Sequence, residues 1–148
     1  CDAILVGAET IERDNPSLTV RRLETERQPL RVILDPKERT NQKATVYTDG
    51  YDTIQVGADY NGLLPLLNRL GDMEKQRLLI EGGPKTIHSF LSEELVDEFY
   101  LVQSNVVHHE PVPSNIDAHR LTQSGLTLDH TETWGEETVQ VWIRTPSQ

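Results

Sequence analysis

The strongest constraint on the fold of this chain comes from residues 78–84, which read Leu-Leu-Ile-Glu-Gly-Gly-Pro. An apolar stretch of strand character ends in an acid, and two glycines lead to a proline that suits the first turn of a helix. Ligands of open α/β sheets bind at the carboxyl ends of strands. Glycines there let a phosphate approach the backbone, and the following helix offers free N–H groups. The spacing fits a phosphate-holding turn and an ordinary strand-to-helix turn equally well.

The rest of the chain alternates strand and helix character. Strands are predicted at residues 2–6, 18–20, 45–48, 53–57, 77–80 and 98–107, with a further strand between Pro29 and Pro36. Helices are predicted at residues 7–13, 61–70 and 85–95. Residues 108–120 are predicted to form a loop, and residues 126–132 and 138–143 a terminal hairpin. Alternation in the middle implies parallel strands joined by helices, to which the hairpin adds antiparallel strands. The predicted fold is α/β, with a mixed, mostly parallel sheet flanked by helices and a C-terminal β-hairpin. We assign residues 1–148 to a single domain.

Charge and cysteine content narrow the classes of function. The formal net charge is −10, which argues against nucleic acid as a partner because phosphate backbones need clustered Lys and Arg. No apolar run approaches the length of a membrane span. A single cysteine, Cys1, rules out an internal disulfide and any cysteine-based zinc site and favours the cytosol. The adjacent His108 and His109 point to opposite faces of a strand, so no metal site is predicted.

Several polar residues could carry chemistry at strand ends. Glu81 could donate a hydrogen bond, transfer a proton or orient a substrate amine. Thr10, Asp14 and Arg21 follow the first strand, and the Arg21 guanidinium could bind a phosphate. Considered alone, each of these residues reads more simply as a solvated surface side chain.

Blocks of sequence together carry a resemblance to a known family. Five blocks, taken in order, resemble the reductase domain of the bifunctional riboflavin-biosynthesis deaminase/reductase family. They are residues 2–11, 14–21 and 29–35, Glu81-Gly-Gly-Pro, and residues 95–98. The resemblance spans residues 2–102. It implies a dihydrofolate-reductase-like fold, NADPH as cofactor and a homodimer. The implied substrate is a phosphorylated small molecule, 5-amino-6-(5-phosphoribosylamino)uracil, whose ribosyl group is reduced to ribityl.

The resemblance also implies roles for individual residues. Those implied to contact NADPH are Thr10, Asp14, Gly82, Gly83, Pro84, Lys85, Thr86, Ile87 and Ser89. Those implied to contact the substrate are Leu18, Arg21 and Glu81, and Glu81 is the candidate catalytic residue. Pro36 stands where the family often has a cofactor-contacting serine. The neighbouring Lys37 is a candidate for the NADPH 2′-phosphate on charge alone.

Three departures from the family pattern leave alternatives open. The sequence has no counterpart of three features of the family. These are the first strand and helix of the reductase domain, the zinc deaminase domain, and the Gly-rich segment expected near residues 108–117. We therefore expect a reductase domain that lacks its N-terminal strand and helix. One alternative is another pterin or pyrimidine reductase of the same superfamily. The other is a non-catalytic nucleotide-binding or interaction domain of this fold.

Overall fold

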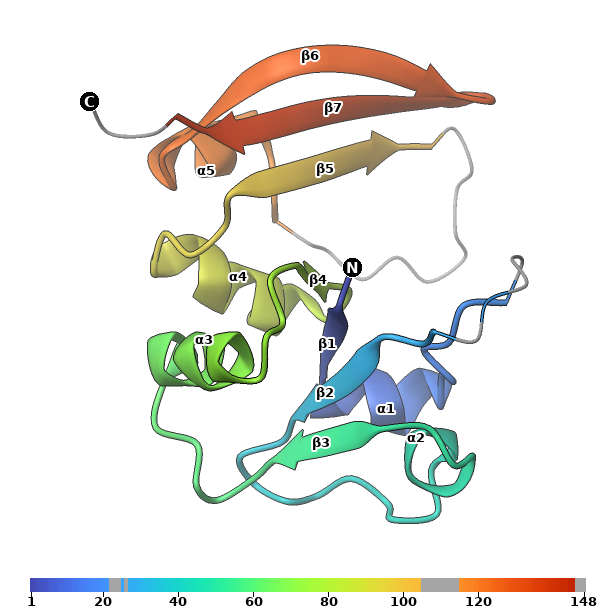
Figure 1. The fold of residues 1–148 in the computed structure, drawn as a ribbon. Coiled ribbons are helices and arrows are strands. Elements are labelled where there is room, and N and C mark those ends of the chain that lie inside the picture. Colours follow the sequence, from blue (N-terminus) through green and yellow to red (C-terminus); the bar gives the residue numbers. More distant parts are fainter. Residues whose placement is uncertain (22–24, 26, 105–114, 146–148) are drawn as a thin grey trace. The chain divides into compact units, whose positions relative to one another are not determined.

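A computed structural model describes residues 1–21, 25, 27–104 and 115–145. They group into two compact units, Cys1–Ile87 and His88–Gln148, which Figure 1 shows in sequence colours. In this part of the chain, no helix has both the length and the apolar character needed to cross a bilayer. The elements are β1 (Ala3–Gly7), α1 (Ala8–Asp14), β2 (Leu30–Leu34), α2 (Thr45–Thr48), β3 (Thr53–Val56), α3 (Leu63–Asp72), β4 (Leu78–Ile80), α4 (Pro84–Ser92), β5 (Glu98–Gln103), α5 (Ala118–Gln123), β6 (Leu126–Trp134) and β7 (Glu137–Arg144).

The first unit is built on a parallel sheet with the strand order β3-β2-β1-β4. Val6 lies opposite Ile33 of β2, and Leu5 lies opposite Ile80 of β4. β1 and β4 are neighbours although more than seventy positions separate them in the sequence. Because all four strands run in the same direction, the segments that follow them emerge at one edge of the sheet.

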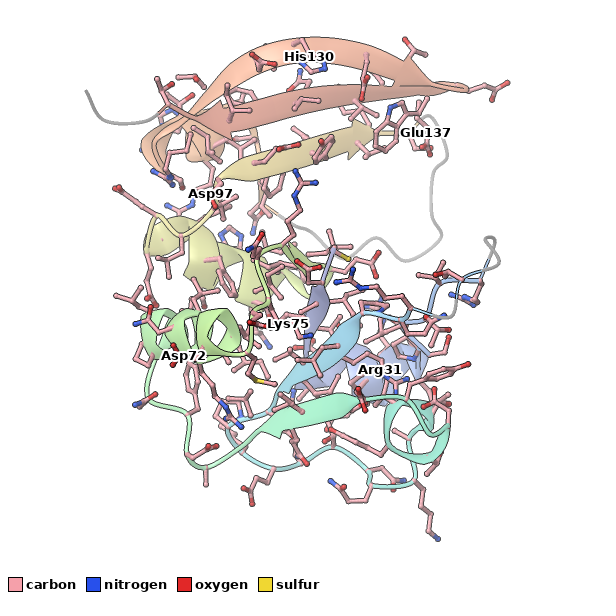
Figure 2. All side chains as sticks on the ribbon, viewed as in Figure 1. Arg31, Asp72, Lys75, Asp97, His130 and Glu137 are labelled. Atoms are coloured by element: carbon pink, nitrogen blue, oxygen red, sulfur yellow. The ribbon has the colours of Figure 1, made fainter. Side chains whose placement is uncertain are left out.

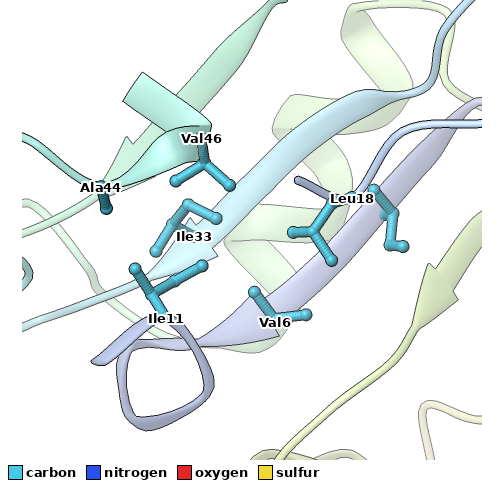
Figure 3. Close-up of a cluster of buried hydrophobic side chains, with 7 residues drawn as sticks. Val6, Ile11, Leu18, Ile33, Ala44 and Val46 are labelled. Carbon is cyan, nitrogen blue, oxygen red and sulfur yellow. The ribbon is translucent and has the colours of Figure 1, made fainter. Parts of the chain in front are cut away.

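Both faces of the two central strands, β1 and β2, are buried. On one face, Figure 3 shows the cluster formed by Ile4, Val6, Ile11, Leu18, Ile33, Ala44 and Val46. Leu5 and Val32 point to the opposite face and are also fully buried. Near-continuous apolar strands are typical of parallel sheets that are covered on both sides. The apolar spacing that predicts a helix from residue 61 gives α3 its buried positions, Leu63, Leu66 and Leu70.

The second unit contains an antiparallel sheet with the order β5-β7-β6. β6 and β7 form the predicted hairpin, and Gly135 adopts a left-handed φ of 64° at its turn. Trp142 on β7 is 5% exposed, as expected for a tryptophan that packs in the core. Leu121 of α5 and Leu126 of β6 are also buried.

The predicted α/β class with a C-terminal hairpin is confirmed, and one detail of the sheet is corrected. The prediction places all strands in one mixed sheet, whereas the described residues form two. The reason lies in the pairing of β7, whose two edges bind β5 and β6. β7 therefore completes its backbone hydrogen bonds with the two strands of its own sheet. The assignment of both units to one domain stays a prediction.

Three local predictions are wrong for identifiable reasons. Residues 45–48 form the short helix α2 and not a strand, because Asn15 Oδ1 accepts a hydrogen bond from the Thr45 N–H and Val46 enters the core. Residues 18–20 are not a strand, since Leu18 has a left-handed φ of 54°. The predicted loop at 108–120 contains the start of α5, where the Asp117 side chain caps the Arg120 N–H.

Candidate functional site

The ends of β1 and β4 bring together the two segments that carry most of the predicted site residues. β1 leads directly into α1, and β4 leads through Glu81, Gly82 and Gly83 into α4. The Glu81 N–H donates a hydrogen bond of 3.0 Å to the Leu5 carbonyl, which continues the pairing of the strands by one residue. The Glu81 side chain is exposed at this edge.

The two glycines after β4 pack against threonines of α1 and α4. A methyl group placed on Gly82 would lie 3.0 Å from Thr10 Oγ1 and 3.3 Å from Val6 Cγ1. One placed on Gly83 would lie 3.6 Å from Thr10 Oγ1 and 3.9 Å from Thr86 Oγ1. Thr10 therefore lies against both glycines, and the predicted cofactor residue Thr86 lies beside Gly83, where a methyl group would make only ordinary van der Waals contacts.

This arrangement fits an anionic group at the start of α4. Pro84 is the first residue of that helix, and the Ile87 N–H donates 3.2 Å to the Gly83 carbonyl. The earlier N–H groups of a helix have no partner within it, and the positive end of the helix dipole favours a phosphate. Gly83 has a φ of 67°, a left-handed conformation that glycine adopts without strain, and its lack of a side chain leaves the backbone open to close approach. The residues present thus fit an anionic group such as a phosphate.

Lys85 lies beside this turn and already has an ionic partner. Its Nζ donates 2.9 Å to Glu9 Oε2 at the start of α1. The hydrogen bond from Lys85 holds the pKa of the Glu9 carboxyl below its usual range. Both side chains are exposed, so the pair contributes little to stability. A ligand phosphate would have to share Lys85 with Glu9.

Asp14 lies one helical turn beyond Thr10 on α1. Residues four apart share a face of a helix, so the two predicted cofactor contacts point in similar directions. Asp14 is exposed and accepts a hydrogen bond of 3.2 Å from Arg13 Nε. Ser89 lies further along α4, in the second unit.

The loop after β2 emerges at the same edge and is held by a buried acid that the sequence did not single out. Asp35 is fully buried and accepts hydrogen bonds from the Arg39 N–H, the Thr40 N–H and hydroxyl, and Gln55 Nε2. Burial raises the pKa of Asp35, but these hydrogen bonds outweigh it and leave the pKa below its ordinary value. The exposed Lys37 lies on this loop, so Asp35 shapes the backbone that carries it.

The depressed pKa of Asp35 predicts a loss of stability in acid. An unfolded aspartate titrates near pH 3.9, and a lower folded value means that the unfolded chain binds the proton first as the pH falls. The stabilisation is therefore complete above about pH 4 and is lost as the pH falls through the folded pKa. We expect the free energy of unfolding, measured in urea between pH 2.5 and about pH 6, to decrease in this window. Asp35→Asn should be less stable near neutral pH and show a shallower decrease; an unchanged slope would exclude Asp35 as its source.

The predicted substrate contacts Leu18 and Arg21 differ in their surroundings. Leu18 is 8% exposed and belongs to the buried cluster on the sheet. Any contact that Leu18 makes with a ligand must therefore come largely from its backbone. Arg21 is exposed and suits a phosphate that arrives from solvent. His108 and His109 lie outside the described residues. Within the described ranges, no group of three or more His, Cys, Asp or Glu side chains is arranged to bind a metal ion.

A cavity of about 250 Å³ lies at the end of β3 and is lined by Val56, Asp59, Tyr60, Asn61, Pro65, Leu66 and Arg69. None of the predicted site residues lines it. The candidate site is therefore defined by the ends of β1 and β4 and not by this cavity.

Comparison with known proteins adds a family and a fold. The model of the family described as "RibD C-terminal domain" matches residues 1–139. The riboflavin biosynthesis protein RibD of Aquifex aeolicus is 34% identical over 116 residues, which cover 64% of this chain and 32% of that protein. The 2,5-diamino-6-ribosylamino-4(3H)-pyrimidinone 5′-phosphate reductase of Methanothermobacter thermautotrophicus is 33% identical over 122 residues, covering 66% of this chain and 56% of the relative.

Solved structures agree in fold. One form of Acinetobacter baumannii RibD superposes with a TM-score of 0.80 at 24% identity, covering 97% of this chain and 47% of that chain. A deaminase/reductase from Thermotoga maritima gives a TM-score of 0.76 at 22% identity, covering 97% of this chain and 45% of that chain. The chain thus spans about a third to a little over half of the relatives described here.

Proposed function

The chain belongs to the RibD C-terminal domain family, and from this premise we propose that it is an NADPH-dependent reductase of riboflavin biosynthesis. The proposed substrate is a phosphorylated ribosylaminopyrimidine whose ribosyl group is reduced to ribityl. Some relatives are named as 2,5-diamino-6-ribosylamino-4(3H)-pyrimidinone 5′-phosphate reductases and others as riboflavin biosynthesis protein RibD, which supports the reaction class and the pathway. We further propose that the protein is cytosolic and that it forms a homodimer. Light scattering of the purified protein would test the dimer.

The observation that carries the proposal is the Gly82-Gly83 turn, which faces Thr10 and Thr86 at the carboxyl edge of the parallel sheet. In our proposal, the N–H groups at the start of α4 and the two threonine hydroxyls hold the cofactor phosphates. When bound, NADPH supplies the hydride. The chain's own contribution is to align the reacting carbon with that donor and to exclude other geometries.

Glu81 is proposed to serve the substrate side of the reaction. The proposed acceptor is the ring-opened ribosylamine, an imine-like group whose carbon receives the hydride and whose nitrogen receives a proton. Glu81 is exposed at the end of β4, one residue before the glycine turn, so it can orient that nitrogen or supply its proton. Arg21 is proposed to bind the substrate phosphate.

The direct test is NADPH oxidation by the full-length gene product in the presence of a phosphoribosylaminopyrimidine. Two acceptors should be compared, 5-amino-6-(5-phosphoribosylamino)uracil and the 2,5-diamino-pyrimidinone 5′-phosphate named in the archaeal relatives. Turnover with either acceptor supports the reductase, and the ratio of kcat/KM identifies the substrate. Saturable quenching of tryptophan fluorescence by NADPH without turnover would instead indicate a non-catalytic binding domain. Absence of both would contradict the proposal.

Lys37 provides a test of cofactor choice. If its ammonium group binds the 2′-phosphate, Lys37→Ala should raise the KM for NADPH by about 5- to 10-fold, because one exposed charge-assisted contact is lost. The KM for NADH, which lacks this phosphate, should not change. Lys75→Ala is the matched control, since Lys75 precedes β4 at the opposite edge of the sheet. Equal effects on both cofactors would remove Lys37 from the 2′-phosphate site.

A further inference from the structure

Arg31 is a fully buried arginine within the otherwise apolar strand β2, and Figure 2 labels it within the first unit. It shares a sheet face with Ile4 and Ile33, both members of the apolar cluster. An arginine in such a place loses its hydration, so it is retained only where its donors find partners. A strand of purely apolar residues would fill this layer equally well.

Every nitrogen of the Arg31 guanidinium has a partner. Asp49 accepts two hydrogen bonds of 2.7 Å in a bidentate pair. The remaining bonds go to the carbonyls of Ser17, Val46 and Tyr51, each at 2.8 Å, and to Thr53 Oγ1 at 3.0 Å. The planar fork of arginine suits this arrangement, because a lysine offers three donors from a single atom.

One of these partners belongs to the segment that carries the proposed substrate contacts. The Ser17 carbonyl receives its bond from Arg31 Nη1 directly before Leu18, whose backbone is left-handed at φ 54°. A non-glycine residue holds this conformation only where its surroundings impose it. Here the imposed constraints are the Arg31 bond on one side and the burial of the Leu18 side chain on the other. After Leu18 the chain turns outward to the exposed Arg21.

We propose that Arg31, held in place by Asp49, is a positioning residue that fixes the backbone at Ser17 and Leu18 and thereby orients residues 18–21 toward the phosphorylated substrate. This inference rests on the proposed function. Neither Arg31 nor Asp49 touches the substrate in this scheme, and the glycine turn that is proposed to hold the cofactor lies on other elements. The anchor should therefore affect substrate binding and leave cofactor binding unchanged.

The first test is Arg31→Lys in the full-length gene product. Lysine can keep the ion pair with Asp49 but not all of the carbonyl contacts, so the substrate KM should rise about tenfold while the KM for NADPH stays within about twofold. Arg144→Lys is the matched control, because Arg144 also donates to backbone carbonyls, those of Val96 and Ser124 in the second unit. It should leave the substrate KM unchanged. Equal changes in the KM for substrate and for NADPH in Arg31→Lys would overturn the proposal.

A second variant separates positioning from stability. Arg31→Met/Asp49→Leu removes both charges and replaces them with apolar side chains, which often restores stability. We expect an unfolding midpoint in urea close to that of the wild type, together with a substrate KM that remains about tenfold raised. A substrate KM that returns to the wild-type value along with stability would show that the pair is merely structural, and would overturn the proposal.

Hydrogen exchange of the ligand-free protein tests the contact between Arg31 and the Ser17 backbone independently of whether the protein is a reductase. Deuterium uptake by the peptide covering residues 15–20 should increase in Arg31→Lys, while uptake by β1 should not. Unchanged uptake at 15–20 would overturn the anchor whatever the enzyme does. Increased uptake in a protein whose wild type turns over neither pyrimidine would retain the anchor and contradict its role toward the substrate.

Discussion

Glu81→Gln is expected to lower kcat for reduction of the phosphorylated pyrimidine about 100-fold, because a positioned proton donor typically contributes a factor of this order or more. The glutamine side chain has the same shape and keeps hydrogen-bonding capacity, but it cannot supply a proton. The backbone should not move, since the N–H of residue 81 remains bonded to the Leu5 carbonyl. Steady-state kinetics with the substrate varied at saturating NADPH would measure the effect.

Two comparisons make this result specific. The Kd for NADPH, measured by fluorescence, should stay within about twofold of the wild-type value, since no cofactor contact is assigned to the Glu81 side chain. Glu93→Gln, in an exposed acid just after α4, should leave kcat unchanged. Normal turnover in Glu81→Gln would remove this residue from the chemistry and leave water or the substrate phosphate as the proton source.

Gly83→Ala is expected to weaken NADPH binding 10- to 100-fold, which corresponds to the loss of one or two charge-assisted hydrogen bonds between a phosphate and the backbone. The added methyl group would meet only Thr10 Oγ1 at 3.6 Å and Thr86 Oγ1 at 3.9 Å. The protein can therefore accommodate it, but the methyl group would occupy the volume proposed for the phosphate. Titration of NADPH followed by tryptophan fluorescence would give the Kd.

Gly135→Ala is the matched control for backbone strain. Gly135 has a φ of 64°, close to the 67° of Gly83, and a methyl group there would have no heavy atom within 4 Å. A non-glycine residue in the left-handed region costs about 1–2 kcal/mol at either position. Both variants should thus lose similar stability, and only Gly83→Ala should lose NADPH affinity. Equal Kd values for the two would show that the turn after β4 does not hold the cofactor.

Local sequence predicts well where chemistry and hydrogen bonding are local. The parallel strands, the terminal hairpin and the helix that begins at Pro84 follow from apolar periodicity and from the conformational limits of glycine and proline. Such predictions fail where a distant partner decides. Residues 45–48 have strand character, but they form a helix whose first N–H, that of Thr45, donates a hydrogen bond to the side chain of Asn15, thirty positions earlier in the sequence. Leu18 has no residue-level signal for a left-handed backbone.

For the candidate site too, local sequence predicted the residue types, and the tertiary structure decided which of them lie close together. The order of the blocks around Thr10, Arg21 and Glu81-Gly-Gly-Pro identified the family from sequence alone, because the residue types at these spacings are specific when combined. Pairing of β1 with β4 then brought Thr10 close to Gly82 and Gly83. No sequence spacing gives that proximity, since strand order depends on how the whole sheet packs.

The sequence by itself determined the α/β class, the family and the glycine turn, because each depends on residue type and short spacing. Only the tertiary structure decided that Leu18 is buried, that Asp35 holds the loop of Lys37, and that Arg31 joins Asp49 to the Ser17 carbonyl. In the sequence Arg31 is one charge within an apolar strand. Its proposed role depends on backbone carbonyl groups contributed by two segments, one at Ser17 and one at residues 46–51. A backbone carbonyl carries no signature of its own in the sequence.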